Sequence, residues 1–428
     1  MDQGPAGSVF GLSAPKIVVV GGGVIGISCA YYLAKDGAEV VVLERERVGA
    51  GASEGNAGTV SPGHPPLNKP GRVAAALRRM LDPTSPLYIH PSWNPGLWRW
   101  LMGFARHCTL EHVESCMRIM APLGKDTFAL FDELVREERI ECEYRADGYY
   151  DVCATTTGLE ESRQEADILT RHGYSPELVD GDELRRREPA MGPGPIGGVY
   201  YPEAATLDPG LFLTRLARAA RRRGVDIRER AGARSVVVQG GRVTGVRLEA
   251  GGVEGCDAVV LATGPYSLSM ARRVGVRLPV QAGKGYHRDI AIGPNGAPPL
   301  RIACVLSESA VFCTPLYTFV RFAGTMEFSG VNRVMRPPRL RQLTQAARQT
   351  FPGLGSARAS SEWCGLRPMS VDGLPIVGPL GDVGGLTVAT GHGMLGLTLA
   401  PVTGEMIARH VLGSGDPRIG ALSPARFT

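Results

Sequence analysis

A strand, a glycine-rich turn, a helix and a second strand that ends in an acid follow one another near the start of the chain. The apolar run Lys16–Val20 is typical of a buried parallel strand, and Gly21-Gly-Gly-Val-Ile-Gly26 follows it directly. We expect a helix from Ile27 to Lys35 and a strand from Glu39 to Leu43, with Glu44 next. This order predicts a dinucleotide-binding βαβ unit.

Each residue of the turn has a physical role in that prediction. Gly21 allows the tight turn, Gly23 lets a pyrophosphate approach the backbone, and Gly26 lets the helix pack on the sheet. Free N–H groups at the helix N-terminus favour the phosphates, and Glu44 lies close to the ~20-residue spacing expected of the acid that bonds a ribose. The unit alone does not distinguish FAD from NAD.

Two later segments favour a flavin. Residues 45–63 form a loop of small residues where an NAD enzyme would resume its helix-strand alternation, although a flexible surface loop is the alternative. A helix at 207–223 leads into a strand at 225–229, and a hairpin at 233–248 precedes another buried strand at 257–261. A hairpin crossover between strands is typical of flavoproteins.

The remaining segments predict a second unit. Helices are expected at 97–108 and 117–138, and short strands, such as 311–322, precede a helix at 340–350. We therefore predict an α/β fold, with a Rossmann-type FAD-binding domain and an inserted α+β substrate domain. The predicted division is a disordered leader at 1–14, an FAD-binding domain at 15–61, 200–270 and 363–428, and a substrate domain at 62–199 and 271–362.

Composition excludes several classes of function. No run of 18 apolar residues is present, so no membrane span is expected. The nine cysteines are scattered without a CxxC pair, which argues against a disulfide framework or a metal site and for a reducing compartment, the cytoplasm. The net charge of +5 is too mild for a nucleic-acid partner. It is compatible with a peripheral contact at the inner face of the membrane, to which Leu97–Phe104 could contribute, although a buried helix there is the preferred interpretation.

The C-terminal third has a second glycine-rich turn. A strand at 386–390 runs into Gly391-His-Gly-Met-Leu-Gly396, and a helix is expected to begin there and run through Glu405. A glycine turn at a helix start is an anion site, suited to negative charge on a reduced flavin.

Motifs in a fixed order then identify a family. They are VVVGGGVIG, NAGTVSPG, AGKGY at 282–286, GLRPMSVDGLPIVG at 365–378 and GHGMLGLTLAP at 391–401. The chain resembles the D-amino-acid dehydrogenases, within the broader family of D-amino-acid oxidase, glycine oxidase and sarcosine oxidase. The resemblance spans nearly the whole chain from Lys16 and implies non-covalent FAD, although Cys364 lies near the position where sarcosine oxidases tether their flavin.

The resemblance also implies the site. Arg367 matches the family arginine that binds the substrate carboxylate, and Tyr286 could line the same pocket or be a core tyrosine. His64 directly follows one of these motifs and His392 lies in another, so both are candidates for the site, although histidines in such places are more often structural. At 310–312, where glycine oxidase has a tyrosine, this chain is apolar. The implied cofactor contacts are Gly21, Gly23, Val24, Ile25, Gly26, Glu44, Arg45, Ser53, Asn56, Ala57, Gly58, Thr59, Ala233, Thr263, Gly264, Gly393, Met394, Leu395, Gly396, Leu397 and Thr398.

The implied reaction is FAD-dependent oxidation of an amino acid, with D-amino acids favoured. A hydride passes from Cα to flavin N5, the imino acid hydrolyses to a 2-oxo acid and ammonia, and the electrons go to a quinone or another acceptor. A D-proline or hydroxyproline-type imino-acid dehydrogenase and a glycine or sarcosine oxidase that uses oxygen stay open as alternatives. An NAD-dependent dehydrogenase and a flavin-bearing scaffold without turnover are the rivals from other classes.

Overall fold

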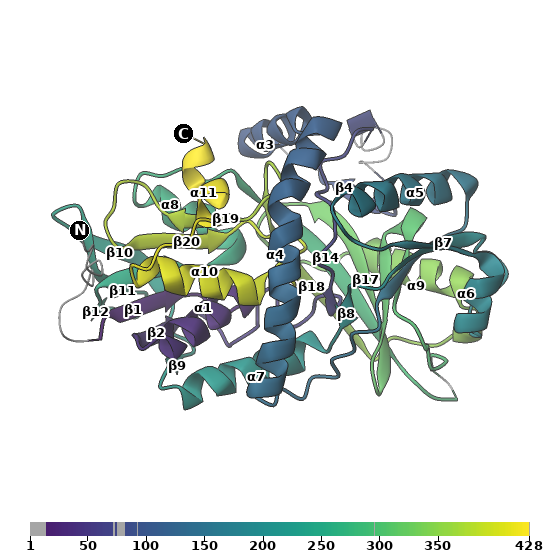
Figure 1. Cartoon of the computed structure of the whole chain (residues 1–428), viewed down its shortest axis with the longest axis horizontal. Helices are drawn as coiled ribbons and strands as arrows, with labels where there is room; N and C mark the ends of the chain where they lie inside the picture. Colours follow the sequence, from purple (N-terminus) through teal and green to yellow (C-terminus); the bar gives the residue numbers. More distant parts are fainter. Residues whose placement is uncertain (1–13, 72, 75–81, 92, 295, 428) are drawn as a thin grey trace, which may run out of the picture.

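Two large β-sheets organise the computed structural model, which describes residues 14–71, 73–74, 82–91, 93–294 and 296–427. The six-stranded sheet lies on the left of Figure 1 and the nine-stranded sheet on the right, and the long helix α4 (Leu110–Glu137) crosses in front of the region where they meet. The leader predicted at 1–14 falls, except for Ala14, outside the described residues.

The six-stranded sheet confirms the predicted βαβ unit. Its central strand β1 is parallel to both β2 and β13. The strand order is β19 (Ile376–Pro379), β20 (Leu386–Thr390), β13 (Ala258–Leu261), β1 (Lys16–Val20), β2 (Glu39–Leu43) and β9 (Asp226–Arg228).

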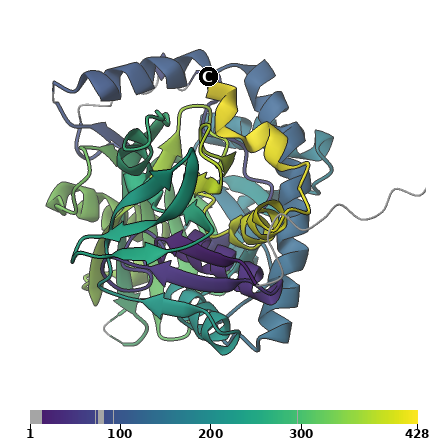
Figure 2. The same ribbon diagram turned by 90° about the vertical axis from the view of Figure 1, so that its left-hand side faces the viewer.

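Both faces of this sheet are covered, which explains why its strands are apolar throughout. Ile17 and Val19 of β1 pack into one core with the helices α1 (Val24–Lys35), α7 (Pro209–Arg222) and α10 (Ala400–Val411). Val18 and Val20 point the other way, against a second core that includes the smaller three-stranded sheet. That sheet, in front in Figure 2, comprises β10 (Ala233–Gln239), β11 (Arg242–Leu248) and β12 (Val253–Gly255), so the predicted hairpin is confirmed and gains a strand.

The nine-stranded sheet is built from the segments between. Helix α9 (Pro337–Thr350) packs on its strands β14 and β17. Its strand order is β18 (Ser361–Ser370), β14 (Val280–Ala291), β17 (Phe319–Phe328), β16 (Val311–Pro315), β15 (Cys304–Leu306), β5 (Tyr149–Cys153), β7 (Gly197–Tyr201) and β6 (Glu177–Asp180), with β4 (Leu87–Ile89) paired to β17. The further described elements are β3 (Thr59–Val60), β8 (Ala205–Thr206), α3 (Pro95–Arg106), α5 (Thr156–Arg171), α6 (Gly181–Arg187), α8 (Ser267–Arg272) and α11 (Ile419–Leu422).

Three details differ from the sequence-based expectations. The strand expected at 311–322 is an antiparallel hairpin, because Leu316 N–H bonds to Phe319 O and reverses the chain. Helix α4 begins at Leu110 rather than 117, since the Thr109 side chain caps its N-terminus. Helix α10 begins at Ala400, so the second glycine turn precedes the helix by several residues instead of opening it. The domain boundaries expected from the sequence stay a prediction.

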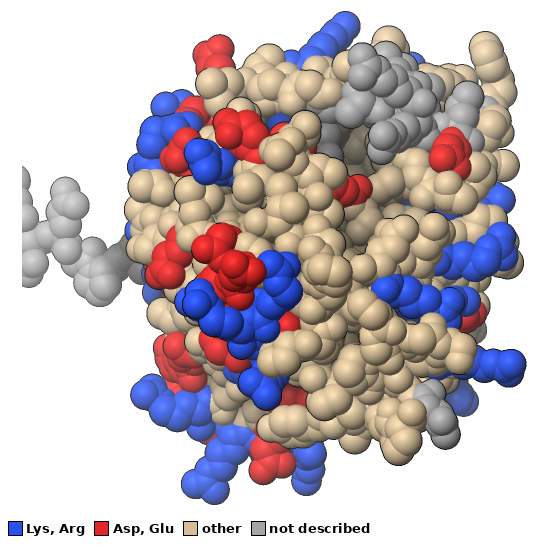
Figure 3. All heavy atoms as spheres, turned by 90° about the vertical axis from the view of Figure 1, so that its right-hand side faces the viewer, with Lys and Arg blue, Asp and Glu red and all other residues tan. Residues whose placement is uncertain are grey.

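The surface is mixed in charge, and no helix among the described segments is long and apolar enough to span a bilayer. Figure 3 shows acidic and basic side chains interspersed on the face at the right of Figure 1.

Candidate active site

An elongated cleft lies at the carboxyl ends of β1, β2 and β13 and extends to β18 of the other sheet. Such a position is where open α/β sheets bind ligands. Most of the cofactor residues expected from the sequence line it, namely Gly21, Gly23, Val24, Ile25, Glu44, Arg45, Ser53, Asn56, Ala233, Thr263, Gly264, Gly393, Met394, Gly396 and Leu397. The expected residues that do not line it are Gly26, Ala57, Gly58, Thr59, Leu395 and Thr398.

The glycine turn is shaped as a phosphate cradle. Gly21 has φ +112°, and a Cβ there would lie 2.4 Å from Ala262 O. A Cβ on Gly26 would lie 1.9 Å from Gly21 O, so only glycine lets α1 pack this closely on the strand. The Ser53 hydroxyl accepts the Val24 N–H at 3.0 Å and thereby ties the small-residue loop to the start of α1. The turn therefore has the geometry that a dinucleotide pyrophosphate requires.

Glu44 is held by two backbone amides. Its Oε2 accepts Gly22 N–H at 2.6 Å and its Oε1 accepts Glu46 N–H at 2.8 Å. Each carboxylate oxygen retains a second lone pair, so both can still accept from a ribose diol. Beside it, the Arg45 guanidinium lies 4.3 Å from the Tyr266 ring centroid, and both side chains line the same end of the cleft.

The loop at 55–57 is clamped by side chains of the nine-stranded sheet. His287 Nδ1 donates to the first carbonyl at 2.7 Å, Arg321 to the second at 3.1 Å, and Thr314 to the third at 2.7 Å. Arg321 is itself fixed by two bonds to Asp289, at 2.8 and 2.9 Å. Burial lowers the pKa of His287 to about 4, so its ring is neutral and can donate only through the protonated Nδ1. Sequence reasoning missed this clamp.

Trp363 forms part of the cleft wall. Its indole fills the space over two glycines, since a Cβ would lie 2.3 Å from the ring at Gly55 and 2.1 Å at Gly365. It also stacks on His287, with centroids 5.2 Å apart and an interplanar angle of 13°. The glycine that follows the tryptophan by two residues was the only sequence signal of this packing.

Arg367 lies on β18 at the other end of the cleft. Its guanidinium rests over Gly285, where a Cβ would lie only 2.4 Å from Cζ, and its Nη1 donates to Thr325 O at 2.7 Å. Among the described residues, no carboxylate lies within 4.0 Å of it. Burial and the charge of Arg339 lower the pKa of Arg367 to about 10, so it is a cation at neutral pH. A half-buried cation with no carboxylate partner is a site for an anion.

His392 lines the same cleft, and the residue after it, Gly393, donates its N–H to the carbonyl of Pro368, next to Arg367, at 2.9 Å. Its Nε2 lies 3.0 Å from Thr403 Oγ1, while its buried Nδ1 has no hydrogen-bond partner among the described residues. Burial lowers the pKa of His392 to about 3, so the ring is neutral. A buried, unpaired polar atom on a cleft wall calls for a ligand atom, and the cofactor cleft supplies the place for one.

Two expected catalytic residues lie elsewhere. Tyr286 is buried and donates to Glu327 Oε2 at 2.7 Å, and it does not line the cleft. His64 Nδ1 lies 2.7 Å from Pro65 O and also stays outside the cleft lining. The structure thus brings Arg367 and His392 together and separates the other two from them. The described residues contain no group of three metal-ligating side chains.

The glycine turn, the acid after β2 and the cleft at the switch point of the sheet define a dinucleotide-binding oxidoreductase fold. The chain belongs to the FAD dependent oxidoreductase family, whose model matches residues 16–410. It is 35% identical over 421 residues to a D-amino acid dehydrogenase of Methylobacterium nodulans, covering 96% of this chain and 99% of the relative. A D-amino acid dehydrogenase of Xanthobacter autotrophicus is 34% identical with the same coverage.

Solved structures agree on the fold. Glycine oxidase from Bacillus cereus superposes with a TM-score of 0.75 at 22% identity, covering 95% of this chain and 98% of that one. L-proline dehydrogenase from P. horikoshii has a TM-score of 0.76 at 17% identity, covering 97% and 98%. FAD is the cofactor, and the glycine cradle, Glu44 and the unpaired Nδ1 of His392 fit it.

Proposed function

We propose that this protein oxidises an amino acid, with D-amino acids as the preferred class, at the Cα–N bond to a 2-oxo acid and ammonia. The observation that carries the proposal is Arg367, a cation that faces the cofactor cleft without a carboxylate partner among the described residues. The identity of 34–35% over nearly the full length to proteins named D-amino acid dehydrogenases supports the substrate class.

Each residue of the cleft would have a separate role in the reaction. Arg367 pairs its planar guanidinium with the substrate carboxylate and so orients the Cα–H toward the interior of the cleft. His392 is neutral and adds no competing charge. Bound FAD supplies the acceptor for the two electrons, and water hydrolyses the released imino acid. No residue of the cleft is needed as a general base, because the neutral amine of the substrate itself drives the loss of the Cα hydrogen. The catalytic roles expected of Tyr286 and His64 remain predictions.

Steady-state kinetics of Arg367→Ala and Arg367→Lys, normalised to bound flavin, test the proposal. Removal of a desolvated charge partner costs about 2–5 kcal/mol, or roughly 30- to several-thousand-fold in kcat/KM. Lysine should recover only part of this, because an ammonium cannot make the planar two-point contact. Flavin content should stay unchanged. If both variants keep kcat/KM within about threefold, or ~0.7 kcal/mol, Arg367 does not bind the carboxylate.

A substrate screen decides between this function and its alternatives. D- and L-amino acids, proline, glycine and sarcosine would be tested with a dye acceptor, in air and without air. We expect D-amino acids to be oxidised and the dye to be reduced faster than oxygen. Peroxide formed at the rate of dye reduction would instead make the protein an oxidase.

We also propose that the flavin is not covalently attached. Cys364 is buried outside the cleft lining, its Sγ donates to Arg333 O at 3.4 Å, and burial raises the pKa of its thiol. A protonated thiol in this position is a poor nucleophile. Yellow colour that remained with acid-precipitated protein would contradict the proposal.

For the acceptor we propose a membrane quinone, reached by docking of α3 on an anionic lipid surface. The helix packs inward through Leu97 and Trp100, while Trp98 and Met102 are exposed on its outer side. The helix has two arginines and no acid, which complements an anionic headgroup layer.

Vesicle co-sedimentation tests this docking. The protein should bind phosphatidylglycerol vesicles and should not bind phosphatidylcholine vesicles. Trp98→Ala should weaken the binding to phosphatidylglycerol. The matched control is Leu178→Ala, an exposed apolar residue on β6. Equal binding by the two variants would refute the α3 contact.

A further inference from the structure

The strand beside Arg367 contains a bulge. The pairing of β14 with β17 slips at Gly285, which faces two residues of β17, Thr325 and Met326. Thr325 has φ +63°, a left-handed conformation that a β-branched residue rarely adopts. Its carbonyl is the acceptor for Arg367 Nη1 at 2.7 Å. The bulge therefore aims a carbonyl at Arg367 that a regular ladder would direct at the neighbouring strand.

The residue before β4 and a buried arginine together satisfy the backbone groups of Met326, which has no partner on β14. Met326 N–H donates to Pro86 O at 2.8 Å, and Met326 O accepts from Arg339 Nη2 at 3.2 Å. Arg339 is fully buried on α9 and also donates to the carbonyls of Pro83, Ser85 and Pro86. Both backbone groups of Met326 thus have partners that are not on β14, which keeps the strained conformation at Thr325 in place.

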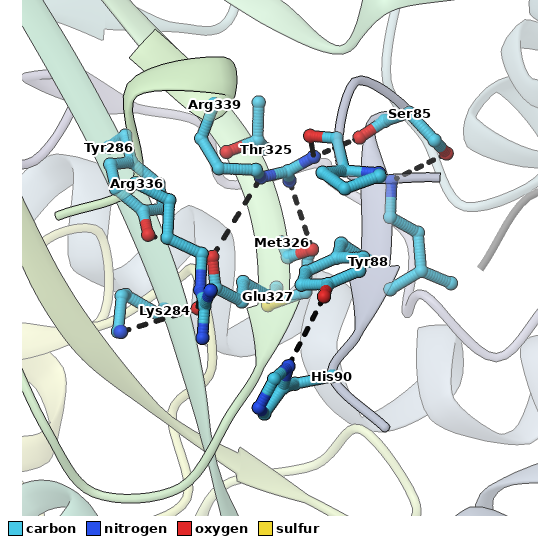
Figure 4. A network of polar contacts seen from close by, with 12 residues as sticks. Ser85, Tyr88, His90, Lys284, Tyr286, Thr325, Met326, Glu327, Arg336 and Arg339 are labelled. Carbon is cyan, nitrogen blue, oxygen red and sulfur yellow. Dashed lines mark hydrogen bonds and ion pairs between the residues drawn. The ribbon is translucent and has the colours of Figure 1, made fainter. Parts of the chain in front are cut away.

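Glu327, which follows the bulge, holds it from the other side (Figure 4). Its carboxylate is fully buried and accepts from Tyr286 at 2.7 Å, Arg336 at 3.1 Å and Lys284 at 3.3 Å, with Arg339 Nε 4.0 Å away. Tyr286 and Lys284 flank the bulge position on β14, so Glu327 ties the two strands together on both sides of the slip. The surrounding cations and hydrogen-bond donors hold the pKa of this carboxyl below its usual range.

We propose that Glu327 and Arg339 are positioning residues that fix the Arg367 guanidinium through the bulge at Thr325. Neither of them lines the cleft, and their cluster packs on the other side of β14 from Arg367, because alternate residues of a strand face opposite sides. The inference rests on the proposed role of Arg367 as the carboxylate site. It also explains why Tyr286 belongs to the motif that the sequence singled out although it stays outside the cleft.

Glu327→Gln tests the inference, because it keeps the side-chain volume and removes the charge. We expect the KM for the amino acid to rise about tenfold and kcat to change less. A tenfold change lies within the range of interaction free energies found between residues of one hydrogen-bond network. The flavin dissociation constant, and the KM of a substrate amine without a carboxylate, should stay within twofold. In an Arg367→Ala background the same substitution should add no further change, because its effect passes through Arg367.

The matched control is Glu362→Gln, which weakens the 2.5 Å pair with Arg288 between β18 and β14, away from the cleft. It should leave KM unchanged. A lower Tm for Glu327→Gln with an unchanged KM would overturn the inference while the role of Arg367 stood. A normal KM for Arg367→Ala would instead remove the proposed function. Should Glu327→Gln not fold, Tyr286→Phe removes one bond to Glu327 and should raise KM about threefold; an unchanged KM there would also overturn the inference.

Discussion

Gly285→Ala should disable the carboxylate site while leaving the fold intact. The added Cβ would lie 2.4 Å from Arg367 Cζ and 2.4–2.5 Å from its two terminal nitrogens, whereas ordinary contacts begin at 3.4 Å. Strand β14 cannot retreat, because it is paired with β17 on one side and β18 on the other. The guanidinium must therefore move by about 1 Å, which lengthens its 2.7 Å bond to Thr325 O.

The expected loss follows from this displacement. A misplacement of about 1 Å at a reacting site costs roughly 100-fold. We therefore expect kcat/KM for an amino acid to fall about 100-fold, equivalent to ~2.7 kcal/mol. Stability should hardly change, because φ of Gly285 is not positive, and the change removes freedom from the unfolded chain, about 0.4–1 kcal/mol in favour of the fold.

The assay is dye-coupled turnover per bound flavin, together with Tm. Gly255→Ala is the control, since this strand glycine has open space, with its nearest atom 4.0 Å from the new Cβ, and lies outside the cleft lining. A Gly285→Ala enzyme with intact flavin and kcat/KM within threefold of the parent would refute both the placement of Arg367 and its role.

Three further outcomes are expected. Glu44→Gln should raise the FAD dissociation constant about tenfold by fluorescence titration, because its amide nitrogen cannot accept one of the two backbone N–H bonds; an unchanged constant would argue against the ribose contact. In the folded protein the pKa of His392 is about 3, below its usual 6.5, so the neutral ring contributes stability that is lost as the pH falls below 6.5. The Tm of His392→Gln should therefore fall less steeply than that of the parent from pH 7 to 4.5. Parallel curves would contradict this expectation. Burial raises the pKa of Asp151 from 3.8 to about 6, so the parent loses stability from this group as the pH rises from about 4 to 6. The Tm of Asp151→Asn relative to that of the parent should therefore rise across this pH range. A Tm difference that does not change with pH would show that the pKa of the carboxyl is not raised.

The sequence alone was sufficient for the dinucleotide half of the molecule. The apolar strands, Gly21, Gly26 and Glu44 each follow from local requirements, since a tight turn, a close helix contact and a buried strand restrict residue types over a few positions. Arg367 and His392 were also found from motifs, and the structure places both in one cleft.

Only the tertiary structure decided what holds these residues in place. The clamp on 55–57 comes from His287, Arg321 and Thr314, more than 200 residues away in the chain, and the bulge at Thr325 depends on a pairing slip against Gly285. Such partners are set by strand register and by which sheet faces the loop. A one-residue change of register would turn every side chain to the opposite face, so no pattern within a segment can specify them.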